Sequence, residues 1–166
     1  MNNPSILDRA CEYARLSGIS LDLKTPLGDG TDGQVWKTSR KTALKSLERQ
    51  RNYAVELECY QRLKQNGITN IEGFSVPQLH GFDDRLWVIE MGIVAAPYIL
   101  DFAKCWLDFP ADYTPETMAY WDEEGADRFE VRWPQVKSLL ASLRQFGIYY
   151  YDAKPANIRF KDEAEL

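Results

Sequence analysis

The stretch FGIYYYDAKPANIRF, residues 146–160, sets polar residues at fixed spacing behind an apolar and aromatic run. Asp152, Lys154, Pro155 and Asn157 fall at offsets of 0, 2, 3 and 5 in this motif. At about 5% for each residue type, such a set occurs by chance in about one chain in a thousand. Asp, Pro and Asn also favour turns, so a polar turn after a strand is the alternative. The motif indicates a site that needs a carboxylate, a cation and an amide close together.

A glycine-rich stretch lies near the other end of the chain. Gly28, Gly30 and Gly33 form the pattern G-x-G-x-x-G, and Val35 follows. Residues 34–38 have the composition of a strand, so the glycines are predicted to lie between two strands and not before a helix. Glycine lets backbone N–H groups approach a phosphate closely. A glycine-rich hairpin that binds nothing is the alternative.

The next strand and helix offer a cation and a carboxylate. Lys45 lies in the short apolar stretch TALK, where an unpaired lysine is costly unless it faces solvent. In the predicted helix 47–65, Glu56 shares a face with Tyr60, whereas Glu58 lies about 200° around the helix axis. We therefore predict that Lys45 pairs with Glu56 and not with Glu58. A glutamate on the solvent face of the helix is the alternative.

The order of predicted elements favours an α+β fold. A first helix is predicted at residues 5–16 and ends at Gly18, because glycine commonly follows a helix. The predicted strands lie at 34–38, 41–47, 77–82 and 86–90, and further helices at 47–65, 98–107 and 134–146. Residues 108–130 are acidic and interrupted by proline, and are predicted to be irregular.

Composition bounds the class of protein. The 166 residues suffice for one domain. A net charge of −5 makes nucleic acid and anionic membrane surfaces poor partners. His80 is the single histidine, which excludes metal sites built from several histidines. Three scattered cysteines, together with N-terminal residues that lack a signal-peptide pattern, predict a cytoplasmic protein.

Taken in order, these motifs resemble those of the protein kinase-like superfamily. GDGTDGQV is similar to the Gly-rich loop, TALK to the V-A-I-K strand, and YYDAKPAN to the catalytic loop H-R-D-L-K-P-x-N of serine/threonine-type kinases. The strand RLWVIEMG looks like the kinase hinge, with Ile89 at the gatekeeper position. The resemblance implies a single kinase-like domain over residues 1–166. It has an N-lobe and hinge at about 20–92, made of an antiparallel sheet plus one helix, and a truncated, mostly helical C-lobe at about 93–166.

The resemblance also implies an ATP-binding site and a role for each motif residue. Backbone N–H groups of residues 28–33 would cover the phosphates, and Lys45, held by Glu56, would contact them. Asp152 would take the proton of the acceptor hydroxyl, Lys154 would neutralise the transferred phosphoryl group, and Asn157 would hold Mg²⁺. The residues implied around the adenine ring are Val35, Ala43, Ile89, Glu90 and Met91.

The chain also departs from the family. Tyr150 and Tyr151 replace the His and Arg of H-R-D, and no D-F-G follows Asn157 within the 166 residues. A lone amide is a poor Mg²⁺ site, so the metal is expected to matter little. Acidic residues at 162, 163 and 165 are candidate substitute ligands. The function expected is an ATP-binding phosphotransferase with weak or absent turnover; the alternatives are a pseudokinase that acts as an interaction module, or a fragment of a longer kinase.

The predicted helix 134–146 carries an apolar face. Its apolar residues recur at helical spacing, namely Val136, Leu139, Leu140, Leu143 and Phe146. In the family, the corresponding helix is buried by later segments that do not follow in this sequence. A large uncovered apolar patch usually marks an interface. We therefore expect self-association, a protein partner, or a further C-terminal part that covers this helix.

Overall fold

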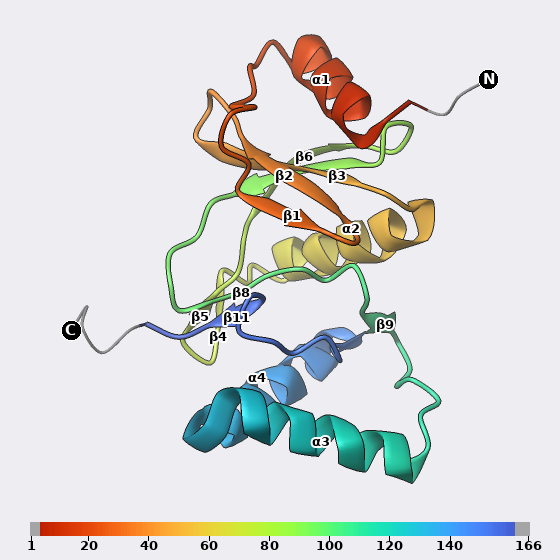
Figure 1. The fold of residues 1–166 in the computed structure, drawn as a ribbon, viewed down its shortest axis with the longest axis vertical. Coiled ribbons are helices and arrows are strands. Elements are labelled where there is room, and N and C mark those ends of the chain that lie inside the picture. Colours follow the sequence, from red (N-terminus) through yellow and green to blue (C-terminus); the bar gives the residue numbers. More distant parts are fainter. Residues whose placement is uncertain (1–3, 162–166) are drawn as a thin grey trace.

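In the computed structural model, which describes residues 4–161, helices and sheets alternate as layers along the long axis of the molecule (Figure 1). Helix α1 (Ile6–Ser17) lies on one side of a five-stranded sheet, and α2 (Gln50–Gln65) lies on the other. Beyond α2 follow a small four-stranded sheet and the helices α3 (Pro115–Phe129) and α4 (Trp133–Leu143). The predicted α+β class is confirmed, and the larger sheet is antiparallel as predicted.

The five-stranded sheet carries the first two motifs. Its order is β1-β2-β3-β7-β6, and every neighbouring pair is antiparallel. The strands are β1 (Gly28–Gly30), β2 (Gly33–Lys37), β3 (Thr42–Leu47), β7 (Val88–Gly92) and β6 (Leu79–Asp83). The central strand β3 is buried along its whole length and sets Lys45 between Val35 of β2 and Ile89 of β7. The predicted strands are present, with ends displaced by one or two residues.

Helix α1 is fixed at both ends and tied to the sheet beneath it. Ser5 and Asp8 form a reciprocal capping box, and Gly18 takes the left-handed conformation that ends the helix. Arg9 is buried and donates to the backbone carbonyl of Leu47 at 2.7 Å. The helix therefore covers the outer face of the sheet through packing and through a hydrogen bond.

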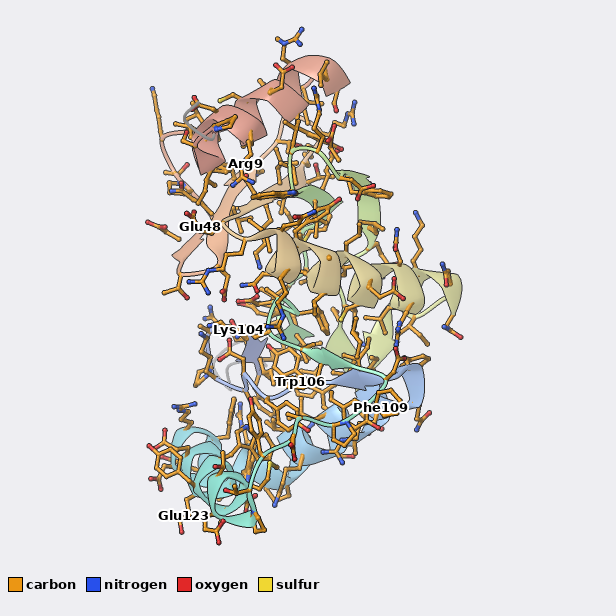
Figure 2. All side chains as sticks on the ribbon, turned by 90° about the vertical axis from the view of Figure 1, so that its right-hand side faces the viewer. Arg9, Glu48, Lys104, Trp106, Phe109 and Glu123 are labelled. Carbon is orange, nitrogen blue, oxygen red and sulfur yellow. The ribbon has the colours of Figure 1, made fainter. Side chains whose placement is uncertain are left out.

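The predicted helix at 98–107 is wrong. That stretch contains β8 (Tyr98–Ile99) and β9 (Trp106–Leu107), with Asp101 between them at φ 62°. A left-handed residue cannot continue an α-helix, so the backbone of Asp101 turns the chain away from helical geometry. Figure 2 shows Lys104, Trp106 and Phe109 along the segment that leads from this turn toward α3.

The four-stranded sheet joins the middle of the chain to its end. Its order is β11-β8-β5-β4. It consists of β11 (Ile158–Arg159), β8, β5 (Phe74–Ser75) and β4 (Asn70–Ile71). β11 and β8 are antiparallel, with Ile158 opposite Ile99. A separate pair is formed by β9 and β10 (Ile148–Tyr149), and β10 lies just before residues 152–157, the DAKPAN segment.

The prediction of an irregular segment at 108–130 is also wrong, because α3 occupies most of it. Thr114 accepts a hydrogen bond from the backbone N–H of Thr117 and so caps the helix. Pro115 then stands at the first helical position, where its missing N–H leaves no bond unmade. The proline that suggested an interruption is thus part of the signal that starts a helix.

The apolar face of α4 is covered within the chain. Its buried residues, each no more than 3% exposed, are Trp133, Val136, Leu139, Leu140 and Leu143. They belong to one core with Phe129 of α3, and the Trp133 ring stacks on Phe129 at 5.9 Å between ring centres. The expectation of an uncovered face on this helix is therefore wrong, and it no longer gives a reason to expect a partner there. No helix of residues 4–161 is long and apolar enough to cross a membrane.

Candidate functional site

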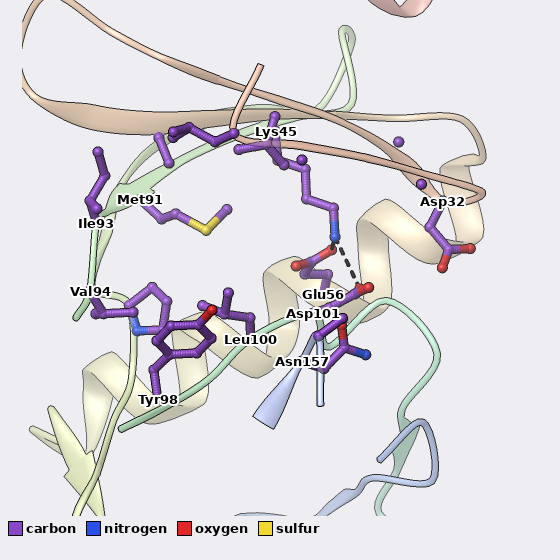
Figure 3. Close-up of a pocket in the computed structure, with 18 of the residues that line it drawn as sticks. Asp32, Lys45, Glu56, Met91, Ile93, Val94, Tyr98, Leu100, Asp101 and Asn157 are labelled. Atoms are coloured by element: carbon purple, nitrogen blue, oxygen red, sulfur yellow. Dashed lines mark hydrogen bonds and ion pairs between the residues drawn. The ribbon is translucent and has the colours of Figure 1, made fainter. Parts of the chain in front are cut away.

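A cavity of about 530 Å³ lies between the five-stranded sheet and the lower part of the molecule (Figure 3). The glycine-rich hairpin β1–β2 and strands β3 and β7 form its roof, and Tyr98, Leu100 and Asp101 line its floor. The predicted site residues that line it are Gly28, Gly30, Gly33, Val35, Ala43, Lys45, Glu56, Met91, Lys154 and Asn157. Motifs from three distant parts of the sequence therefore meet at one cavity.

A buried charge cluster occupies one side of this cavity. Lys45 Nζ lies 2.7 Å from Glu56 Oε2 and 3.0 Å from Asp101 Oδ1. Figure 3 shows Lys45 reaching from the sheet toward both carboxylates. The predicted choice of Glu56 is confirmed, because Glu58 faces the other way and pairs with Arg62.

The three charges shift one another's pKa values. Burial lowers the pKa of Lys45, but the charges of Glu56 and Asp101 outweigh burial and raise it above its usual value. Burial raises the pKa of Glu56, whose side chain is 1% exposed, and the Lys45 charge opposes this shift. Because the cluster holds two carboxylates and one cation, the charge of Asp101 adds to the rise in the Glu56 pKa. Burial also acts on Asp101, but Lys45 outweighs it and lowers the Asp101 pKa.

Asp101 is the site residue that the sequence analysis missed. It follows β8, and the backbone N–H of Leu100 donates to the carbonyl of Asn157 at 2.8 Å. This bond and the β8–β11 pairing bring Asp101 and Asn157 to the same edge of the cavity (Figure 3). A single aspartate within the apolar run YILDFA was the available signal. Because residues 98–107 were predicted to form a helix, the sequence did not single out this aspartate as a site residue.

Phe102 anchors the turn that presents Asp101. Its side chain is fully buried, and its ring meets that of Tyr60 on α2 at 5.2 Å and that of Tyr150 at 5.6 Å, both edge to face. The Tyr150 hydroxyl donates to the Leu100 carbonyl at 2.7 Å. Tyr150, two positions before the DAKPAN segment, thus supports the backbone before Asp101.

The DAKPAN segment forms a compact polar group beside the cavity. Asn157 Nδ2 donates to the Asp152 carbonyl at 3.1 Å and to Asp152 Oδ2 at 3.2 Å. Lys154 Nζ lies 3.4 Å from the same carboxylate oxygen. Lys154 and Asn157 line the cavity, and Asp152 contacts both of them. Because the Asn157 amide nitrogen is engaged, its oxygen is left to accept a hydrogen bond or to bind a cation.

The glycine-rich hairpin is fixed at its tip by Gly33 and by the neighbouring Asp32. A Cβ atom on Gly33 would overlap the Ser46 carbonyl of β3, so glycine is required for this close approach. At the tip, Asp32 accepts from Asn52 at 2.8 Å and pairs with Lys104 at 3.1 Å. The hairpin therefore contacts the segment that follows Asp101.

Three predicted site residues, Asp152, Ile89 and Glu90, are not among the residues that line the cavity. Asp152 contacts the lining residues Lys154 and Asn157, whereas the two residues of β7 are directed elsewhere. Successive residues of β7 face opposite sides of the sheet, so Glu90 points toward α1. There Glu90 accepts from Thr42 at 2.6 Å and from Tyr13 at 3.0 Å. Ile89 shares the Lys45 side but is fully buried in the core. The cavity wall beyond Met91 is formed by Gly92, Ile93 and Val94.

Comparison with known proteins adds no assignment: no protein-family model matches the chain, and the search of curated proteins gives no match. Within residues 4–161, no group of three or more His, Cys, Asp or Glu side chains is placed to hold a metal ion. The acidic residues at 162, 163 and 165 lie outside the described residues.

We predict that Lys45→Met makes stability depend on pH. Without the cation, Glu56 is buried with no compensating charge, and its raised pKa rises further. A group with a raised folded-state pKa stabilises below its unfolded pKa, and this contribution is lost as pH rises through the folded pKa. Urea unfolding of Lys45→Met should show a loss of about 3–5 kcal/mol at pH 8 that shrinks toward pH 5.

Two further variants complete this measurement. Lys45→Met combined with Glu56→Gln should lose the pH dependence, because no carboxylate remains to titrate at that position. Lys37→Met, on an exposed position of β2, serves as the matched control and should resemble the wild type. A pH dependence that persists in the double variant would contradict the assignment to Glu56.

Proposed function

We propose that the chain is a kinase-like phosphotransferase that binds ATP in the cavity between its sheet and its lower half. The observation that carries this proposal is the convergence of Lys45, Lys154 and Asn157 on one cavity beneath a glycine-rich hairpin. Phosphoryl transfer requires positioning and neutralisation of charge more than covalent chemistry. Positioning and charge neutralisation are both supplied here by two cations, by exposed backbone N–H groups and by a nearby carboxylate.

Asp101-Phe102-Ala103 takes the place of D-F-G in this proposal. In protein kinases that motif follows the catalytic loop, its Asp binds Mg²⁺ and its Phe packs in the interior. Here the equivalent segment precedes the catalytic-loop motif in the sequence, and the pairing of β8 with β11 supports its placement beside Asn157. The fold is then that of a kinase whose last strands are connected in a different order.

In this proposal, each residue of the cavity has its own role in phosphate transfer. Lys45, held by Glu56 and Asp101, neutralises the inner phosphates, while the hairpin N–H groups cover the outer ones. Asp152 accepts the proton of the acceptor hydroxyl, and Lys154 neutralises the phosphoryl group in transit. Mg²⁺, if bound, would supply positive charge that offsets the charge of the phosphates. The Asp101 carboxylate and the Asn157 amide oxygen fit its preference for oxygen ligands.

A binding module that holds nucleotide or a protein without transfer is the second candidate. The observation that favours it is the sparse set of acidic groups, since no cluster of three metal-ligating side chains occurs in the described part of the chain. Both candidates use the same cavity. They differ in whether Asp152 acts on an acceptor, so activity separates them.

We predict that the protein binds ATP and that Lys45 provides much of the affinity. The comparison pairs Glu56→Gln with Glu56→Gln combined with Lys45→Met, because this background avoids a buried unpaired glutamate. By calorimetry, loss of the Lys45 cation should weaken ATP binding about tenfold or more, since it removes a charge-assisted contact to phosphate. If wild-type protein fails to bind millimolar ATP with or without Mg²⁺, the nucleotide assignment is wrong.

We also predict that Asp101→Asn reduces the Mg²⁺ dependence of ATP binding. The wild type should bind ATP more tightly with Mg²⁺ than with chelator, because Asp101 adds a carboxylate to the amide of Asn157. In Asp101→Asn, most of that difference should disappear, while metal-free binding stays within a few-fold of wild type. An unchanged Mg²⁺ response in this variant would exclude Asp101 as the metal ligand.

Asp152→Asn should abolish phosphate transfer and leave ATP binding nearly intact, because the carboxylate acts on the acceptor and not on the nucleotide. Transfer is measured with radiolabelled ATP as incorporation into the protein itself, checked by intact mass. Asp112→Asn, at an exposed position, is the matched control. Binding without any transfer by wild-type protein would select the binding module.

A further inference from the structure

A second cavity of about 490 Å³ is lined in part by Pro155 and Ala156, at the end of the DAKPAN segment. Tyr98 and Ala156 line both cavities, so the two are neighbours. The remaining wall comes from the end of α3, the residues before α4, and β11. None of the motifs found in the sequence accounts for this cavity.

Three of the residues that line it are arginines, Arg128, Arg132 and Arg159. They bring three guanidinium groups to one concave site in a chain whose net charge is −5. Arg128 contacts Glu124 at 2.6 Å. Clustered arginines in a concave site favour an anionic ligand.

Of the three arginines, Arg132 is the best placed to bind an anion. Its guanidinium carbon lies 4.6 Å from the centre of the Phe160 ring, so the ring supports one face of the planar group. Within residues 4–161, the structure gives Arg132 no carboxylate partner. The side chain is half-buried. Its N–H edge is therefore oriented by stacking and available for a bidentate contact with an oxyanion.

Arg128 is oriented by different contacts. Nη1 donates to the Ala153 carbonyl at 3.3 Å, and Nη2 contacts Glu124. Ala153 lies between Asp152 and Lys154 in the sequence, so this bond joins the second cavity to the backbone of the proposed catalytic segment. The guanidinium is held by two partners, which lowers the entropy lost when it takes up a ligand.

We propose that this cavity binds a phosphate monoester, with Arg132 and Arg128 as its principal contacts. A carboxylate is balanced by one arginine, whereas a phosphate monoester carries close to two negative charges near neutral pH and has three acceptor oxygens. Two or more guanidinium groups around a cavity match the second ligand better. This site binds its ligand independently of nucleotide in the first cavity.

The test is calorimetric titration of the full chain with phosphoserine at low ionic strength. Wild-type protein should bind it saturably, and Arg132→Gln or Arg128→Gln should each weaken binding about tenfold. The matched control is Arg144→Gln, because Arg144 also lies over an aromatic ring, that of Tyr149 at 5.8 Å, but outside the cavity. Arg144→Gln should bind as the wild type does.

Two further titrations separate this site from the first cavity and identify the ligand. The Lys45→Met, Glu56→Gln double variant should bind phosphoserine normally, and saturating ATP should not displace it. Inorganic phosphate that binds as tightly as phosphoserine would assign the site to the free ion, and tighter binding of a phosphoserine peptide would assign it to a phosphorylated protein; both support the phosphate site. Absence of saturable binding, equal loss in Arg144→Gln, or displacement by ATP would overturn it.

Discussion

The buried contact of Lys45 with Glu56 and Asp101 is the interaction on which the site depends. It joins β3, α2 and the turn after β8, which otherwise belong to separate layers of the molecule. A buried cation is retained only when opposite charges compensate the loss of water. The cluster therefore fixes the distance between the sheet above the cavity and the turn below it, and that distance sets the height of the cavity.

Much of the upper part of the fold could be predicted from the sequence. The strands there alternate or run apolar over short stretches, and helix α2 shows a clear period, so Glu56 was assigned to the correct face. For the lower part of the fold, the prediction failed where the backbone conformation departs from what the hydrophobic pattern indicates. Asp101 takes a left-handed conformation, and Pro115 begins a helix where it was interpreted as interrupting one. Neither feature changes the hydrophobic periodicity from which helices and strands are predicted.

The candidate site could be predicted only in part, for a related reason. Lys45, Glu56, Lys154 and Asn157 stand in motifs with fixed spacing, so they could be found locally. Asp101 reaches the cavity through the pairing of β8 with β11, a contact between residues far apart in the sequence. Spacing carries no information about such pairing. The same holds for the cover that Phe129 of α3 gives to the apolar face of α4.

The long separation in sequence between β8 and β11 affects the order in which the site can fold. The Lys45–Glu56 contact closes a span of 11 residues, and the Lys45–Asp101 contact one of 56. These can form once the chain up to Asp101 is available, whereas the floor beside Asn157 awaits β11, which lies much further along the chain. Closing longer spans costs more chain entropy and slows folding. The charged half of the cavity is thus able to assemble early, and the docking of one short edge strand completes the site.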